Sequence, residues 1–254
     1  MTWVGFLWVK PAFAQINESD TVHYQVRASI NGNYQKGNVD ILVIRSRLDF
    51  LWTLQKDIVF KSQNNSLYQS FYDKKADNDV FSRNYLYFRP LSKIYPFAIA
   101  YISANYRRKI DKRYFVGLGG TLQLINTKNH VLKMSLSAIY EQTAFTESLF
   151  NHIEYNGRKN IQVWRATAYI SGVHYLFNKR LRLFYDAYGQ PALARADKNN
   201  YRTQFDIGFD VPMWKGLSLN ALYTFTHENL VVQKIKNDDK ILAFGLSYQL
   251  KVNH

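Results

Sequence analysis

The sequence of 254 residues contains no cysteine, and it has no run of about 18 apolar residues. The first absence excludes a disulfide framework and thiolate metal sites, and the second excludes a bundle of membrane-spanning helices. Phosphate-binding loops, dinucleotide fingerprints and histidine metal spacings are also missing, so no cofactor is expected. What remains is a chain rich in aromatic residues (16%) with a net charge of +14.

The basic residues are spread along the whole chain and form no single cluster. Nucleic-acid binding usually requires a concentrated basic patch, so no nucleic-acid partner is expected. A dispersed positive charge is typical of a solvated surface, or of a surface that attracts anionic lipid head groups.

The clearest pattern lies near the C-terminus, between residues 239 and 252. Apolar residues alternate there with small or polar ones for about ten residues, the length of a tilted strand that crosses a hydrocarbon layer. In a membrane barrel the apolar face meets lipid and the polar face lines the lumen. A C-terminal strand of this kind is expected to close the barrel against the first strand. The apolar face consists of Leu242, Phe244, Leu246, Tyr248 and Leu250.

Eleven further stretches have strand composition and are separated by turn residues. Every second connection is short, whereas most of the others are longer and richer in charge, notably 73–79, 145–160, 192–200 and 230–240. An even strand number with short turns at one end and long loops at the other is typical of bacterial outer-membrane proteins. The sequence therefore predicts an all-β fold, a twelve-stranded antiparallel transmembrane β-barrel of outer-membrane type. The expected strands are 22–34, 39–54, 57–72, 80–90, 96–107, 113–125, 131–143, 161–177, 180–190, 201–211, 216–228 and 239–252. A soluble ligand-binding barrel, with its apolar faces inside, is the alternative.

The first fourteen residues resemble the end of a secretory signal peptide. Residues 4–9 form a short apolar core, and Ala12-Phe13-Ala14 is a small-x-small cleavage site, which makes Gln15 the first mature residue. No basic residue precedes the core, so the signal is expected to be truncated at its start. We predict a signal peptide at 1–14 and a barrel domain at 15–254. The other interpretation is a structural first strand.

Strand alternation places many charges on the predicted inner face. Charge is tolerated there because a lumen is wet or ion-paired. Eight bases against six acids is near balance, which favours cross-lumen ion pairs and a structural or passive role. A narrow pore, or a site for a small polar ligand, is the alternative, although an ion-selective channel would show a clear excess of one sign. The bases are Arg27, Arg45, Arg47, Lys133, Arg165, Arg182, Arg202 and Lys251, and the acids are Asp49, Glu141, Asp186, Asp206, Asp210 and Glu228.

No enzymatic activity is expected. A phospholipase-like barrel hydrolase would need a serine, a histidine and an orienting polar residue together on the outer wall. His227 falls on that face, but no serine is expected among its neighbours. A barrel protease would need clustered acids and a histidine in the loops, and Glu147, His152 and Glu154 are the only such group in the longest loop.

Residues 107–120 form a basic hairpin that leads into a glycine-rich strand, and Gly37-Asn38-Val39-Asp40 forms the first turn. Together these motifs resemble the salt-induced outer-membrane protein (YdiY-like) family, over about residues 24–248. The resemblance implies a barrel of unknown function in the bacterial outer membrane, and it implies no chemistry. The expected partners are outer-membrane lipid and, during insertion, the barrel-assembly machinery. The basic clusters at 107–109 and 112–113 are candidates for contact with lipopolysaccharide phosphates.

Overall fold

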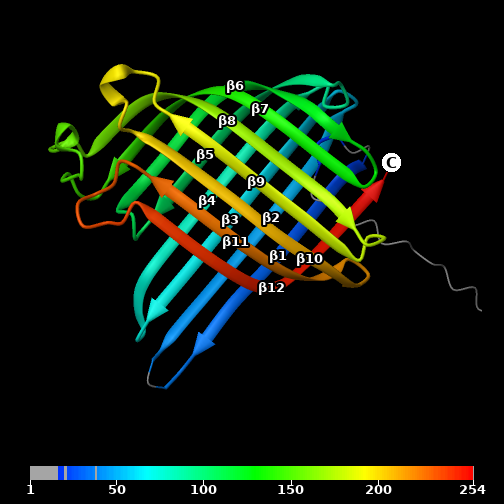
Figure 1. The fold of residues 1–254 in the computed structure, drawn as a ribbon, viewed down its shortest axis with the longest axis horizontal. Coiled ribbons are helices and arrows are strands. Elements are labelled where there is room, and N and C mark those ends of the chain that lie inside the picture. The colour runs from blue at the N-terminus through cyan, green and yellow to red at the C-terminus, as the bar shows by residue number, and fades with distance from the viewer. Residues whose placement is uncertain (1–16, 20–21, 38, 254) are drawn as a thin grey trace, which may run out of the picture.

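The computed structural model describes residues 17–19, 22–37 and 39–253, and within them twelve antiparallel strands form a closed barrel (Figure 1). Each strand pairs with its neighbours in sequence, and β12 pairs with β1, from Gln25 opposite Lys251 to Asn31 opposite Gly245. The predicted fold is thereby confirmed, including closure by the C-terminal strand. The strands are β1 (Val22–Gln35), β2 (Ile41–Gln55), β3 (Ile58–Phe71), β4 (Lys74–Phe88), β5 (Ile94–Asn105), β6 (Ile110–Asn126), β7 (His130–Phe145), β8 (Asn160–Leu176), β9 (Leu181–Pro191), β10 (Tyr201–Trp214), β11 (Leu217–Glu228) and β12 (Asp238–Asn253).

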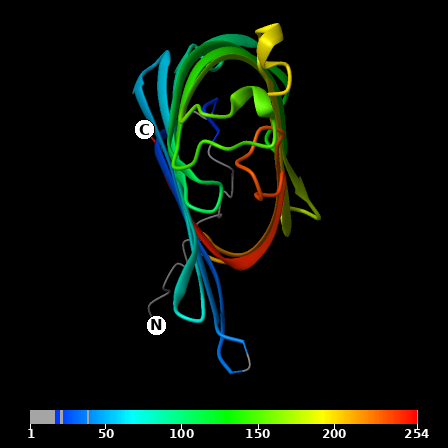
Figure 2. The same cartoon turned by 90° about the vertical axis from the view of Figure 1, so that its left-hand side faces the viewer.

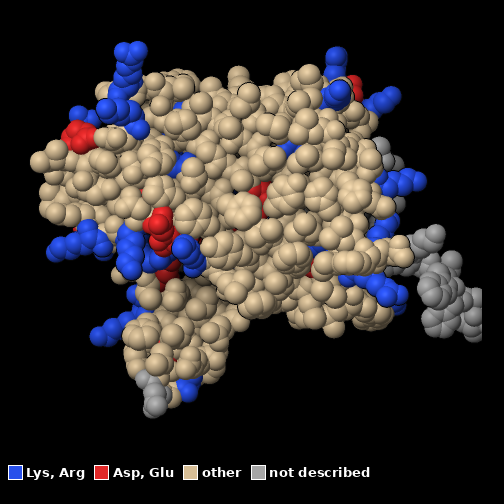
Figure 3. Space-filling model, viewed as in Figure 1, with Lys and Arg blue, Asp and Glu red and all other residues tan. Residues whose placement is uncertain are grey.

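Apolar side chains cover most of the outer face of the barrel. On β12, Leu242 and Phe244 are each 63% exposed, and on β6 Leu118 is 71% exposed. Figure 3 shows the same arrangement on one side of the molecule, where most projecting Lys and Arg side chains lie toward the two ends. Burying these groups in lipid is favourable and exposing them to water is not. The alternative of a soluble barrel with its apolar faces inside is therefore wrong.

The alternation is interrupted on β3 and partly inverted on β4, which explains why the sequence predicts these two strands less clearly. Their outer face carries hydrogen-bonded polar pairs, in which Asn64 donates to Ser62 and Asn84 to Ser82, each at 3.0 Å. The rings of Phe81, Tyr85 and Tyr87 on β4 lie on the inner face, and Tyr87 is 5% exposed. This sector of the barrel therefore presents rings to the lumen.

The two ends of the barrel differ in their connections. The short-turn end holds the turns β2–β3, β4–β5, β6–β7, β8–β9 and β10–β11, the longest of which has five residues, 89–93. The long-loop end holds 146–159, 192–200 and 229–237. The predicted loop at 73–79 is wrong, because β3 and β4 meet in a two-residue turn. Both turn residues, Tyr72 and Asp73, have positive φ, as a tight hairpin requires. Asp77 and Asp79 are consequently strand residues of β4.

The long loops are ordered over the mouth of the barrel. The β7–β8 and β11–β12 loops lie within the outline of the barrel when it is viewed near its axis (Figure 2). They pair through an isolated bridge between Phe150 and Val232, and their apolar side chains form a cluster with Ile110 and Ile161. Two short 3-10 helices, η1 (Ile153–Tyr155) and η2 (Arg195–Asp197), are joined by the Tyr155 hydroxyl, which donates to Asp197 at 2.7 Å. None of the helices in the described residues is long and apolar enough to span a bilayer. The predicted signal peptide lies outside the described residues.

Candidate functional site

Of the fourteen charged residues predicted for the inner face, all except Lys251, whose side chain is not described, lie on that face, because alternation fixes which face a strand residue takes. Ten of these thirteen are buried, with at most 8% of the residue exposed, whereas Arg45, Arg47 and Asp206 are partly exposed. They fall into different groups, since register and strand tilt decide which ones meet. The ten buried residues are Arg27, Asp49, Lys133, Glu141, Arg165, Arg182, Asp186, Arg202, Asp210 and Glu228.

The first group, which we call the Asp210 cluster, lies inside the barrel outside the cavity described below. The Arg27 guanidinium lies 2.9 Å from the Asp210 carboxylate, although 183 residues separate them, and Arg182 pairs with the same carboxylate. Asn220 donates to Asp210 at 2.6 Å. Both guanidinium groups also lie over the ring of Phe184, at 5.3 Å and 4.6 Å. Because the charges are paired and buried, this part of the lumen is packed.

Arg47 and Asp49 form a separate pair at 2.9 Å within β2. On β9 and β10, Asp186 and Asp206 lie directly opposite each other in the register. Asp206 accepts a hydrogen bond from Gln204 at 2.9 Å. These residues extend the polar inner face from β2 across the lumen to β10.

The second group, the Glu141–Glu228 network, lies toward the long-loop end. Arg113 binds Glu228 through two hydrogen bonds of 2.8 Å, and Arg165 and Arg202 pair with Glu141 at 3.1 Å and 2.5 Å. Bidentate guanidinium–carboxylate pairs of this kind are among the strongest polar contacts. The network links β6, β7, β8, β10 and β11.

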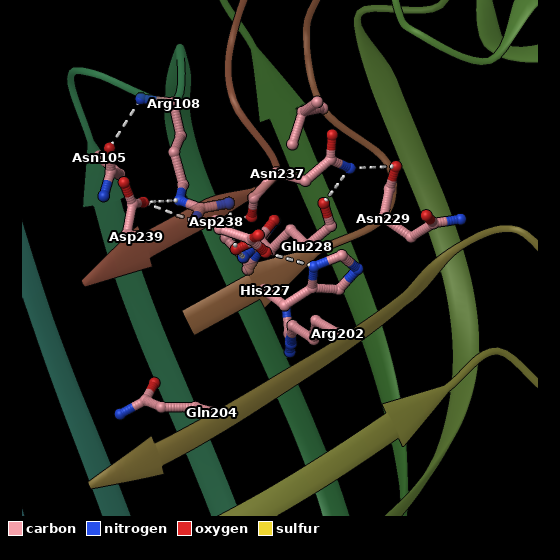
Figure 4. Close-up of polar contacts among 12 residues, drawn as sticks. Asn105, Arg108, Arg202, Gln204, His227, Glu228, Asn229, Asn237, Asp238 and Asp239 are labelled. Atoms are coloured by element: carbon pink, nitrogen blue, oxygen red, sulfur yellow. Dashed lines mark hydrogen bonds and ion pairs between the residues drawn. The ribbon is translucent and has the colours of Figure 1, made fainter. Parts of the chain in front are cut away.

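Figure 4 shows the rim of this network. Arg108 reaches inward from the β5–β6 turn to Asp239 at 2.5 Å, and Asn237 donates to the backbone carbonyl of Glu228 at 2.7 Å. Arg107 pairs with Asp239 as well, at 2.5 Å, and with Asp77 at 3.2 Å. Most of the predicted head-group cluster therefore binds acids of the barrel itself.

The third group lies toward the short-turn end and is built by residues 17–19, which we call the N-terminal plug. The Glu18 carboxylate lies 3.0 Å from Lys133 and 3.3 Å from Lys61, and Tyr95 donates to it at 2.7 Å. Ser19 donates to the carbonyl of Pro90 at 2.6 Å. Burial alone would raise the pKa of Glu18, but the two ammonium groups outweigh it and hold that pKa below its usual range. The plug is thus fixed to the wall by charge.

A cavity of about 420 Å³ lies in the lumen, and none of the residues of the Asp210 cluster lines it. Its lining reaches from Arg107 and Asp239 at the long-loop end to Lys128 and Lys179 at the short-turn end. Aromatic rings form much of one wall. Phe81, Tyr101 and Phe115 stack across β4, β5 and β6, with ring centroids 5.9 Å and 4.5 Å apart.

Arg83 lies beside these rings on β4 and lines the cavity. Its guanidinium is 5.5 Å from the ring of Phe81 and 5.9 Å from that of Tyr101, and it reaches within 5.7 Å of Tyr188 on β9. Rings on the opposite strands β4 and β9 thus approach one guanidinium. Arg83 makes no ion pair with any described residue, and the same holds for Arg45, which has a 3.4 Å hydrogen bond to Thr224. The side chain of Lys251 is not described.

Sequence reasoning missed several charges of the lumen. Glu18 lies outside every strand, so alternation says nothing about it. Arg83 is on β4, where the inverted pattern hides the inner face. Arg113 and Arg108 were assigned to a surface hairpin, yet both are buried. For Arg113 the signal was available, because it alternates with the outward Tyr114.

Neither His227 nor His152, the two histidines considered for a hydrolase, forms a hydrogen bond with a serine of the described residues. His227 contacts Asp238 at 2.6 Å and stacks on Tyr201, and its register partner on β10 is Thr203. His152 lies 3.9 Å from Glu154 in the β7–β8 loop. Among the described residues, no group of three or more His, Cys, Asp or Glu side chains is arranged to hold a metal ion.

Comparison with known proteins supports the fold. A family model described as "Protein of unknown function, DUF481" matches residues 28–250. This is consistent with the predicted family resemblance, although the salt-induced character that it implies stays a prediction. No curated protein matches the chain.

Several solved outer-membrane barrels are similar in structure. The NanC porin has a TM-score of 0.55 at 12% identity, covering 89% of this chain and 100% of that one. An outer-membrane channel from Pseudomonas putida F1 has a TM-score of 0.50 at 13% identity, covering 95% and 100%. The translocator domain of the autotransporter NalP from Neisseria meningitidis has a TM-score of 0.50 at 10% identity, covering 90% and 89%. At such low identity these likenesses concern the fold alone.

Proposed function

The chain belongs to the DUF481 family, and for this member we propose a passive role in the bacterial outer membrane, as a narrow passage for small polar solutes. The observation that carries the proposal is the cavity, whose lining extends from the long-loop end to the short-turn end. The porin and the channel named above lend support from similarity of fold, because both are passages of the same general architecture.

The location follows from the outer face. A belt of exposed Leu, Phe and Tyr around a closed barrel suits lipid, and lipid-facing charge at mid-depth would cost about 2–4 kcal/mol. We further propose that the long-loop end faces outward and that the plug faces the periplasm, as short turns usually do. Lys112 and the partly exposed Lys109 remain available for lipid phosphates at the outer rim, although Lys109 also pairs with Glu147 at 3.3 Å.

A purely structural barrel is the second candidate, and a specific observation favours it. The Asp210 cluster packs part of the lumen with buried ion pairs, the N-terminal plug is fixed to the wall toward the short-turn end, and the loops pack together at the long-loop end. In a barrel of that kind the ion pairs serve packing, and solutes do not cross. Neither candidate function involves a catalytic step, so we propose that the protein is not an enzyme.

Planar-bilayer recording of the purified, folded protein tests the proposal. A passage gives discrete conductance steps at micromolar protein or below, and heat-modifiable gel mobility establishes that the inserted chain is folded. Folded protein that inserts into liposomes but gives no conductance and no swelling in isosmotic sugar would overturn the passage and leave the structural barrel.

A further inference from the structure

We propose that the passage selects small anions, and that Arg83 and Arg45 are the residues that determine this selectivity. The inference rests on the proposed passage and adds the chemical class of its solutes. It follows from the charges that face the cavity, which differ from those of the inner face as a whole.

The cavity wall is strongly basic. Ten of the charged residues along its lining are Lys or Arg, and four are acids, namely Glu18, Asp79, Glu228 and Asp239. Outside the cavity lining the described charges of the predicted inner face are close to balance, with four bases, Arg27, Arg47, Arg165 and Arg182, against five acids, Asp49, Glu141, Asp186, Asp206 and Asp210. A clear excess of one sign along a pore is what selects ions of the other sign.

Pairing strengthens this asymmetry. Glu18, Glu228 and Asp239 are each matched by a cation of the wall, and Glu141 matches Arg202. The cations of the wall that form no ion pair with a described residue are Arg45, Arg83, Lys128 and Lys179, and Asp79 is the corresponding acid. Lys128 and Lys179 are exposed at the short-turn end. Arg45 and Arg83 are therefore the cations without an ion pair that set the positive electrostatic potential in the middle of the lumen.

The surroundings of Arg83 leave its charge available. Its closest contacts are the faces of Phe81, Tyr101 and Tyr188, which hold a guanidinium in place without neutralising it, while the charge of Asp186 acts on it from beyond ion-pair distance. Arg83, Tyr101 and Tyr188 all line the cavity, so a solute that crosses passes close to the guanidinium. In a narrow space of low effective dielectric, an unpaired charge acts far more strongly than in water.

The donors of the cavity wall also fit an anion. Arg83 and Arg45 line the cavity without an ion pair to a described residue, and the hydrogen bond between Arg45 and Thr224 is long, at 3.4 Å. Guanidinium groups of this kind bind carboxylate or phosphate oxygens in a planar, bidentate geometry. The stacked rings beside Arg83 offer an apolar surface to the carbon skeleton. Small organic carboxylates and phosphate monoesters are therefore the expected solutes.

The test uses the reversal potential of the full mature chain in a bilayer with a gradient of dilute KCl, since dilute salt limits screening. The wild type should favour chloride over potassium. Arg83→Gln should lower the chloride-to-potassium ratio about fivefold, as expected when one poorly screened charge leaves a narrow passage. Arg45→Gln should act in the same direction. Arg195→Gln is the matched control, because Arg195 is exposed in the β9–β10 loop and does not line the cavity.

The outcomes separate the two levels of the proposal. No conductance from folded protein defeats the passage itself. Conductance that favours potassium or neither ion leaves the passage intact and overturns anion selectivity. An equal loss of selectivity in the Arg195→Gln control would remove the role of Arg83 and Arg45. Replacement of chloride by gluconate or glycerol phosphate then tests the organic anions directly, and a current carried by chloride alone would overturn that class.

Discussion

Replacement of Asp210 by Asn is expected to destabilise the barrel severely. The Asp210 carboxylate neutralises Arg27 at 2.9 Å and also pairs with Arg182, and the three side chains are 5%, 8% and 2% exposed. An Asn of the same shape keeps the packing but leaves two buried guanidinium groups without their acid. Breaking a buried pair in this way costs about 3–5 kcal/mol in the free energy of unfolding.

The measurement is urea unfolding of the reconstituted barrel, followed by tryptophan fluorescence and by heat-modifiable gel mobility. Asp238→Asn is the matched control, because the Asp238 side chain is 54% exposed. Among the described residues, Asp238 forms an ion pair only with His227. Exposed pairs contribute about 0–1 kcal/mol, so this variant should unfold close to the wild type.

A double variant tests whether the unpaired guanidinium groups cause the loss of stability in Asp210→Asn. Arg182→Met added to Asp210→Asn removes one of the two unpaired cations, so part of the lost stability should return. If Asp210→Asn unfolds within about 1 kcal/mol of the wild type, the reasoning fails, because the lumen is then wet enough to screen the cluster.

Three further predictions concern other parts of the barrel. Gly119→Ala should cost about 1–3 kcal/mol in urea unfolding, because its Cβ would lie 2.5 Å from a carbonyl oxygen of β7, whereas Gly120→Ala, with nothing within 4 Å, should not destabilise. Because the pKa of Glu18 is lowered, the stability it contributes is present above the ordinary carboxyl pKa and is lost only as pH falls through the lowered value. Glu18→Gln should therefore raise single-channel conductance already at neutral pH, and an unchanged conductance would refute the plug. Since the chain has no cysteine, Phe205→Cys should react with a lipid-phase thiol reagent and Gln204→Cys with a water-soluble one; the reverse labelling would contradict the orientation of the strands.

The fold was largely predictable from alternation, since period-two patterning assigns each residue to one face of a strand. It placed Arg202 and Asp210 inside and Leu242 outside before any pairing was known. It was weak at β3 and β4, where Ser62 and Asn84 lie outside, and on β4 the rings of Phe81, Tyr85 and Tyr87 lie inside. The predicted loop at 73–79 was wrong for the same reason, since the weak pattern hid the start of β4.

The sequence by itself determined the strand number, the closure of β12 on β1 and the sign of most inward charges, because these depend on local period and on turn residues. The tertiary structure decided which charges meet. Arg27 and Asp210 are 183 residues apart in the sequence, and they meet because strand tilt and register place them at the same level along the barrel axis. The same geometry pairs Glu18 with Lys133 and leaves Arg83 without an ion pair to a described residue. Composition therefore gave a nearly balanced inner face, whereas closure of the barrel separated it into buried ion-paired groups and a basic cavity.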